Sequence, residues 1–285
     1  MAGQGDIAIE PSGGGVGAFV RNIDLARDVS GNVAGLLRQA LGEHGVLFFR
    51  DQSLTPDQHV ALAERFGPIN VNRFFAHVDG HPQIARVSKE PEQTDNIGGG
   101  WHTDHTYDLE PAMGSILVAR DLPPRGGDTV YANMYTAFET LSAGMQEMLS
   151  GLRALHSSRH AFGAEANYRK RNSDLAGRLG NPEAATQDAV HPLVIRHPIS
   201  GRRALFVNPG FTIGIEGWHR EESAPLLQML YAHAQRPEHT YRFQWRDGSV
   251  AFWDNRATWH YALNDYAGAR RELHRVTIEG EALAA

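Results

Sequence analysis

Residues 241–254, with the sequence YRFQWRDGSVAFWD, contain two short apolar runs separated by a polar turn. The runs cover residues 241–245 and 250–253, and the pair Asp247-Gly248 between them is typical of a turn. Similar runs recur through the second half of the chain, at residues 115–119, 129–133, 189–197, 203–208 and 273–279. Many short strands separated by Gly, Pro, Asn and Asp predict an antiparallel sandwich or barrel.

Helices are predicted on both sides of these strands. Apolar residues at helical spacing favour a one-sided buried helix at 32–43, and Thr55-Pro56-Asp57-Gln58 is a helix start that should lead to about Phe66. Two more helices are expected at 137–151 and 221–235. Short strands are expected at 7–10, 17–23 and 45–49, the first two around a glycine run.

Composition favours one globular domain over residues 1–285. The chain is 41% hydrophobic and has a net charge of -6, so nothing suggests a nucleic-acid partner, and no apolar stretch reaches the length of a membrane helix. The first residues lack the pattern of a secretion signal, and we therefore expect a cytoplasmic protein. Residues 163–187 are polar and without a steady period, which predicts a lid over the site or, equally, a surface loop.

The chain has no cysteine and 15 histidines. Disulfides, thiolate zinc sites and a cysteine nucleophile are thereby excluded, and any metal must be held by nitrogen and oxygen ligands. The sequence WHTD at 101–104 offers such ligands. On a strand, His102 and Asp104 would share one face, while His105 would point to the other.

A His-x-Asp triplet is weak by itself, because about one is expected by chance. The second copy, His77-Val78-Asp79, precedes a glycine and a proline, and we interpret it as a surface turn. For the first copy, a hydrogen-bonded histidine pair is the alternative to a metal site. One further imidazole would complete a set of two histidines and one carboxylate, which non-haem Fe(II) oxygenases use because it leaves coordination positions open.

The last part of the chain supplies candidates for the missing groups. Residues 250–260, VAFWDNRATWH, are a strand, a polar turn and then His260. Arg271 and Arg275 follow, and on a strand they would share one face. Two guanidinium groups aimed the same way indicate anionic ligands, whereas an exposed basic strand is the alternative.

Together these motifs resemble the taurine dioxygenase and aryloxyalkanoate dioxygenase family of Fe(II)/2-oxoglutarate-dependent oxygenases. The resemblance covers nearly the whole chain. It rests on several motifs in order: FRDQ at 49–52, RFG at 65–67, WHTD at 101–104, GGDT at 126–129, WDN at 253–255, His260 and the two arginines. It implies a double-stranded β-helix, or jelly-roll, core with helices packed outside.

The resemblance also implies roles for particular residues. His102, Asp104 and His260 match the iron ligands. Thr129 and Arg271 match the positions that hold the distal carboxylate of 2-oxoglutarate, and Trp253 belongs to the same cofactor pocket. Arg275 matches the position that receives the acidic group of the substrate. In such enzymes O2 and 2-oxoglutarate are consumed, succinate and CO2 are released, and the substrate is hydroxylated.

The substrate is expected to differ from taurine. The family's polar contacts to taurine align with Asn72, Phe75 and Gly98, and its apolar pocket positions align with Phe162 and Phe211. Fewer polar partners beside Arg275 predict a bulkier anionic organic acid, namely a sulfonate, a sulfate ester or an aryloxyalkanoate. By family analogy we expect a homo-oligomer.

Two other functions remain open at this level. A jelly-roll could bind an organic acid without converting it. The run GGGVGA at 13–18 also fits the dinucleotide fingerprint GxGxxA, although the residues after it are strand-like, whereas that fingerprint must open a helix.

Overall fold

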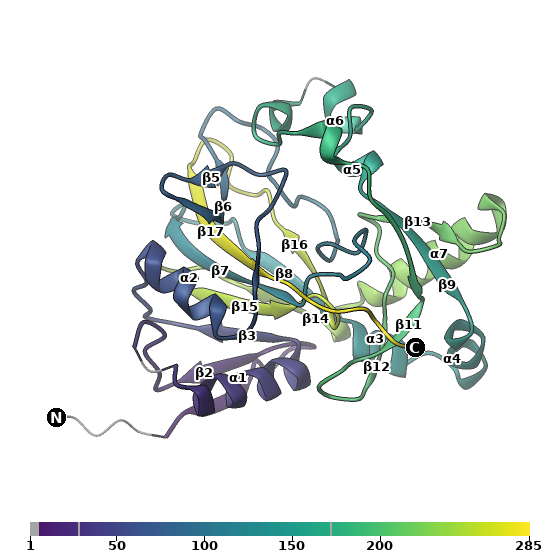
Figure 1. Ribbon diagram of the computed structural model, residues 1–285, viewed down its shortest axis with the longest axis horizontal. Coiled ribbons are helices and arrows are strands. Elements are labelled where there is room, and N and C mark those ends of the chain that lie inside the picture. Colours follow the sequence, from purple (N-terminus) through teal and green to yellow (C-terminus); the bar gives the residue numbers. More distant parts are fainter. Residues whose placement is uncertain (1–5, 28, 172) are drawn as a thin grey trace.

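The computed structural model describes residues 6–27, 29–171 and 173–285. Its larger sheet has nine strands in the order β1-β2-β3-β15-β7-β17-β6-β5, with β4 paired to β17 (Figure 1). The pairs are antiparallel except β2 with β3. The strands are β1 (Ala8–Pro11), β2 (Ala18–Arg21), β3 (Val46–Phe49), β4 (Ile69–Asn70), β5 (His77–Val78), β6 (His81–Lys89), β7 (Gly114–Asp121), β15 (Val250–Asp254) and β17 (Arg271–Ile278).

A smaller antiparallel sheet faces it, formed by β14 (Thr240–Phe243), β8 (Thr129–Asn133) and β16 (Thr258–Ala262). Tyr131 and Phe243 of this sheet pack in one buried cluster with Leu117, Trp253 and Leu273 of the larger sheet. Two mainly antiparallel sheets therefore enclose a common core, and the predicted jelly-roll is confirmed. Further short strands form two sheets beside it: β9 (Arg153–Ser157), β10 (Asp188–Pro192) and β13 (Thr212–Ile215), and β11 (Val194–Arg196) with β12 (Arg203–Leu205).

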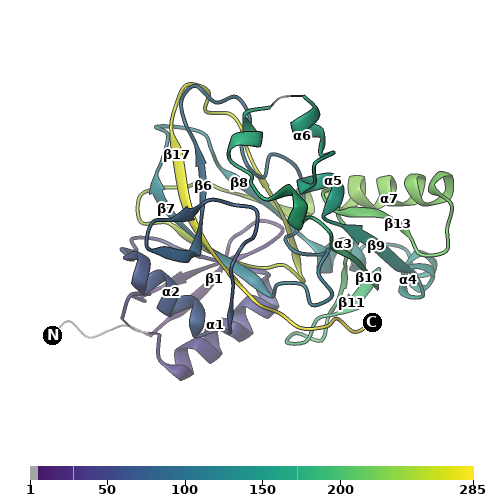
Figure 2. The ribbon, with the colours of Figure 1, turned by 45° about the horizontal axis from the view of Figure 1, so that its top comes forward.

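Helices α1 (Gly31–His44) and α2 (Pro56–Glu64) cover the outer face of the larger sheet (Figure 2). Leu37 and Leu62 from these helices pack against Ile116, Phe252 and Val276, so the apolar side of each helix is buried. The predicted start of α2 is confirmed as a capping box between Thr55 and Gln58. No helix in the described part of the chain is long and apolar enough to cross a membrane.

The helix predicted at 137–151 is instead two helices, α3 (Met134–Glu139) and α4 (Ala143–Ser150). The side chain of Asn133 caps the first and that of Ser142 caps the second, so each has its own start signal. Helix α7 (Arg220–Ala234) matches the helix predicted at 221–235. Short helices complete the chain: α5 (Arg159–Phe162), α6 (Asn167–Lys170), η1 (Asp174–Gly177), η2 (Pro182–Ala184) and η3 (Pro237–His239).

The strand predictions were incomplete. The run at 189–197 is divided between β10 and β11, and the run at 203–208 ends at Leu205. Strands β4, β6, β9, β13 and β16 were not predicted, because each is short or mixes apolar with polar residues. The second His-x-Asp triplet is only partly a turn, since His77 and Val78 form β5.

The glycine run at 13–15 leads into strand β2, which pairs antiparallel with β1. The dinucleotide fingerprint needs a helix at this point, within a unit of parallel strands. The alternative of a dinucleotide site, which the strand-like residues already disfavoured, therefore does not fit the structure.

Candidate active site

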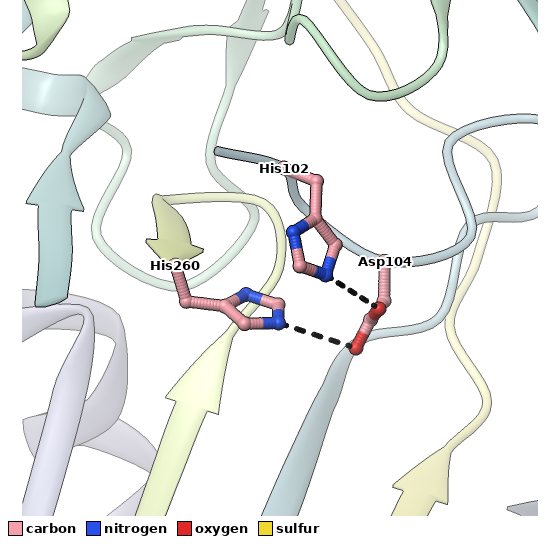
Figure 3. A group of neighbouring side chains, drawn as sticks. All are labelled: His102, Asp104 and His260. Carbon is pink, nitrogen blue, oxygen red and sulfur yellow. Dashed lines mark ion pairs between the residues drawn. The ribbon is translucent and has the colours of Figure 1, made fainter. Parts of the chain in front are cut away.

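His102, Asp104 and His260 lie together although they come from distant parts of the chain (Figure 3). One possible ligand atom from each lies within 4.8 Å of the others. The Nε2 atoms of His102 and His260 are 3.7 and 3.9 Å from the two carboxylate oxygens of Asp104. These distances exceed those of hydrogen bonds, so the three groups point at a shared centre without bonding one another.

Backbone pairing holds the two histidines side by side. His260 is the middle residue of β16, and His102 forms an isolated bridge with it through two hydrogen bonds of 3.1 and 2.8 Å. The strand predicted for WHTD extends no further than this bridge. Asp104 begins a turn, in which His105 has a φ of 60° and bonds to Asp108. The turn, rather than strand alternation, directs the Asp104 carboxylate towards the histidines.

Neighbouring groups fix the orientation of these side chains. His102 Nδ1 lies 2.7 Å from the carbonyl oxygen of Gly100, which leaves Nε2 for the centre. Gly210 packs so closely that a Cβ there would lie 2.8 Å from the Cβ of His102. Arg275 donates from Nη1 to Asp104 Oδ2 at 3.0 Å. The glycine, the carbonyl and the arginine therefore all restrict the ligand geometry.

Burial sets the protonation of the cluster. Desolvation lowers the pKa of His102 and holds that of His260 well below its ordinary value, although the Asp104 carboxylate opposes both shifts. Burial alone would raise the pKa of Asp104, but Arg275 and the two imidazoles outweigh it and keep that pKa below the usual range. At neutral pH the cluster is two neutral imidazoles and one carboxylate, the states in which such groups bind a metal.

The cluster opens into a cavity of about 650 Å³ between the sheets and the segment that contains α5 and α6. Arg271, Leu273 and Arg275 of β17 all line it, so alternation along this strand places both arginines on one face. Trp253 also lines the cavity. Its ring centre is 4.7 Å from that of His260, and its Nε1 donates to Asn255.

Arg271 is a buried charged group of the cavity that forms no ion pair with any described residue. Its side chain is 3% exposed, and its Nε and Nη2 have no hydrogen-bond partner among the described residues. Thr129 lies in the same wall, and its hydroxyl accepts from Trp245 Nε1 at 3.0 Å, which leaves the hydroxyl proton free to donate. A buried arginine that points unpaired into a cavity fits an anionic ligand, because an unpaired buried charge is costly.

Two residues beside Arg271 were given no role by the sequence interpretation. Tyr131 lies two positions after Thr129 on β8, lines the cavity, and has a buried hydroxyl without a partner in the described chain. Strand alternation from Thr129 was a usable signal for it. Gly127 has a φ of 70°, and a Cβ there would lie 2.9 Å from Arg271 Cδ. Any other residue at this position would therefore clash with the arginine side chain.

Much of the remaining wall of the cavity is apolar, although Asp95, Asn96, Arg171 and Asn264 also line it. Phe75, Phe162 and Phe211 line it as predicted from the aligned positions, and Gly98 lies beside His102. Asn72 is different, because it is absent from this lining and its Oδ1 accepts from the backbone amides of Phe74 and Phe75. The prediction that Asn72 lines the pocket is therefore wrong. Asparagine side chains commonly accept hydrogen bonds from backbone amides two or three residues later and so stabilise a turn.

The segment at 163–187 contributes to the same wall. Tyr168, Leu175 and Leu179 line the cavity and pack in one cluster with Phe75 and Phe162. The next two residues after Tyr168 have other partners: Arg169 donates to the carbonyl of Leu179, and Lys170 pairs with Glu165. Of these three consecutive residues, Tyr168 alone lines the cavity.

Comparison with known proteins places the chain in a family. Residues 8–277 match the family model described as "Taurine catabolism dioxygenase TauD, TfdA family". The chain is 34% identical over 273 residues to an "Alkylsulfatase" of Acinetobacter baylyi, covering 94% of this chain and 83% of the relative. It is 34% identical over 280 residues to an "Alpha-ketoglutarate-dependent sulfate ester dioxygenase" of Pseudomonas putida, covering 97% and 90%.

Among solved structures, a "Taurine Dioxygenase from Burkholderia xenovorans" superimposes with a TM-score of 0.81 and 38% identity, over 98% of this chain and 93% of that one. The resemblance inferred from the motifs is thus confirmed over almost the full length. The chain belongs to the TauD, TfdA family of dioxygenases.

Proposed function

We propose that this dioxygenase uses Fe(II) and 2-oxoglutarate to hydroxylate a small organic anion with a bulky apolar group, and that sulfate esters are the favoured class. The observation that carries the proposal is the pairing of the His102, Asp104 and His260 cluster with the unpaired guanidinium of Arg271 in one cavity. The names of the two relatives described above support the sulfate ester.

The residues present fit an iron ion by the chemistry of their donors. Two neutral imidazoles and one carboxylate suit Fe(II) and leave its other positions open. When bound, the ion supplies a place where O2 and 2-oxoglutarate react, one oxygen atom entering succinate and the other entering the substrate. In this proposal His102, Asp104 and His260 bind it.

Arg271 and Thr129 would orient 2-oxoglutarate. The free Nε and Nη2 of Arg271 can form a bidentate pair with a carboxylate, and the Thr129 hydroxyl can add a third hydrogen bond. Tyr131, with its free hydroxyl on the same wall, is a further candidate donor. The ring of Trp253 lies tilted against that of His260 and would exclude water from the bound acid.

Arg275 would hold the anionic group of the substrate. Its Nη1 is used by Asp104, but its Nε has no partner among the residues described, and its guanidinium lies 4.6 Å from the ring centre of Phe75. Because Arg275 also bonds to Asp104, an anion bound to Arg275 would lie close to a proposed iron ligand. The C–H bond nearest the anionic group is therefore the one placed for attack.

For a sulfate ester, that geometry has a specific chemical consequence. Hydroxylation of the carbon that carries the ester oxygen gives a hydroxylated ester, which breaks its C–O bond to release sulfate and an aldehyde. The apolar wall of Phe75, Phe162 and Phe211 would accommodate the rest of the alcohol. We also propose that residues 163–187 are a cover over this cavity within one catalytic domain.

A substrate panel tests the proposal. Sulfate esters, sulfonates and aryloxyalkanoates are incubated with Fe(II), ascorbate and 2-oxoglutarate, and succinate, sulfate and aldehyde are measured. We expect succinate to match substrate oxidation for an apolar sulfate ester, and taurine to be poor. Taurine turnover as fast as that of every larger acid would refute the substrate assignment.

A second test concerns the reaction class. Fe(II) and 2-oxoglutarate added without oxygen should produce a visible absorption band, which a jelly-roll that only binds an organic acid would not produce. We keep the homo-oligomer, expected from family analogy, and the cytoplasmic location as proposals. Sedimentation and cell fractionation test them.

A further inference from the structure

A second cavity, of about 280 Å³, lies away from the active site and is lined by four arginines. It is formed by β2, by the residue after β3, and by β14 with the residues that follow it. The arginines are Arg21, Arg50, Arg242 and Arg246, and none of its lining residues is acidic. The chain as a whole has a net charge of -6, whereas this cavity gathers four positive side chains in one place.

Two of these arginines are neutralised by carboxylates. Arg21 pairs with Glu10 at 3.3 Å, and Arg242 pairs with Asp128 at 2.7 Å and Asp265 at 3.0 Å. Arg50 and Arg246 form no ion pair with any described residue. The cavity therefore presents two guanidinium charges that no described carboxylate neutralises by direct contact.

Arg50 is held in place rather than free in solvent. It donates to the hydroxyl of Ser249, and its guanidinium lies 4.3 Å from the ring centre of Phe243 and 5.6 Å from that of Phe19. Ser249 also accepts from the backbone amide of Arg246 at 2.9 Å, so one hydroxyl ties the two arginine segments together. A preorganised guanidinium binds an oxyanion with less loss of conformational entropy.

The positive charges are close enough to affect one another. Burial lowers the pKa of Arg50 most, and Arg246 and Arg21 lower that pKa further, while Tyr241 and the adjacent Asp51 oppose the shift. An anion between the guanidinium groups would relieve this mutual repulsion. Phosphate and sulfate groups fit best, because their several oxygens can accept from two guanidinium forks at once.

We propose that this arginine pocket is a binding site for a phosphate or sulfate group, either as the free ion or on a small ester. The cavity holds such a group together with a few carbon atoms, and the rings of Phe19 and Tyr241 provide an apolar side for them. The site shares no lining residue with the active-site cavity. It therefore stands independently of the substrate assignment.

Calorimetric titration at constant ionic strength tests the proposal. The full chain is first loaded with Fe(II) and saturating 2-oxoglutarate without oxygen, and is then titrated with inorganic phosphate, sulfate or glycerol phosphate. We expect saturable binding that weakens about tenfold in Arg246→Gln, equivalent to about 1.4 kcal/mol. Tighter binding of glycerol phosphate than of phosphate would identify an ester as the ligand, and the reverse would identify the free ion.

The control is Arg220→Gln, which removes an exposed arginine from the first turn of α7 and should bind like the parent protein. Arg21→Gln is a second pocket variant with an exposed side chain, and it should also weaken binding. Thermal melts establish that each variant is folded. Equal affinity in the parent and both pocket variants, or no saturable binding in the parent, would overturn the proposal.

Discussion

The two walls of the active-site cavity are built in different ways. One wall consists of strands from the two facing sheets, β8 and β16 of the smaller and β17 of the larger, which carry Thr129, His260, Arg271 and Arg275. The opposite wall consists of short helices within residues 159–187, which carry apolar side chains such as Phe162 and Tyr168. Hydrogen-bonded strands hold their side chains in fixed register, whereas short connected helices rely mainly on packing.

The difference separates two tasks. In the function proposed above, metal and carboxylate binding need donors fixed to within a fraction of an ångström, and we assign these donors to the strand wall. We assign substrate choice to the helical wall, whose shape can change without disturbing those donors. The helical wall is nevertheless attached to the strands, since Arg178 donates to the carbonyl of Ser88 on β6 at 2.9 Å.

The largest effect is expected from the strand wall at the metal cluster. His260→Ala should reduce turnover by on the order of a thousandfold or more, because one of three proposed iron ligands is lost. Succinate release and the oxygen-free absorption band with Fe(II) and 2-oxoglutarate measure this. His77→Ala, in the second His-x-Asp triplet, is the matched control and should keep both signals; a variant of His260 with a normal band would remove the basis for the assignment.

A smaller effect is expected at the co-substrate end of the same wall. Arg271→Gln should raise the KM for 2-oxoglutarate by roughly 10–100-fold, since a hydrogen bond to a charged group contributes about 1.5–3 kcal/mol. Iron binding, measured by titration without 2-oxoglutarate, should be retained. If the KM for the prime substrate rose while that for 2-oxoglutarate stayed constant, the roles of the two arginines would have to be exchanged.

Acidic pH should destabilise the packing of helix α2 against the larger sheet. His59 on α2 is buried against β7, with Nε2 3.1 Å from the carbonyl oxygen of Ile116, and burial lowers its pKa to about 3, although that hydrogen bond opposes the shift. The unfolded chain binds this proton near the ordinary pKa of 6.5. Stability from the neutral ring is therefore complete above that pH and is lost as the pH falls towards 3.

His59→Gln should make the free energy of unfolding less dependent on pH, by about 1.4 kcal/mol per pH unit within that range. Denaturant unfolding at several pH values measures the slope. The exposed His160→Gln is the control. An unchanged slope in His59→Gln would show that other groups dominate acid unfolding.

The smallest effect is expected from the helical wall. Leu175→Ala should raise the KM for an apolar sulfate ester roughly fivefold, because a partly buried side chain loses about 1 kcal/mol of apolar contact. Succinate formed without substrate should not change. Leu36→Ala, on the outward side of α1, is the control; an equal loss of 2-oxoglutarate turnover in Leu175→Ala would mean that the two walls are not separate in function.

Some features followed from the sequence alone, for physical reasons that act over a few residues. Strand alternation placed Arg271 and Arg275 on one face, and the capping box located the start of α2. The absence of cysteine limited any metal site to nitrogen and oxygen ligands. The motifs in order indicated the family, which the comparisons confirm.

Only the tertiary structure decided how the site closes. Asp104 reaches the histidines through a turn rather than a strand, Arg275 bonds to Asp104, and Asn72 is turned away to cap a local turn. Strand β16 and the bridge between His102 and His260 were also not predictable. Local spacing determines which face a side chain takes, whereas its partners depend on how distant strands pair, and that pairing is set by burial across the whole core.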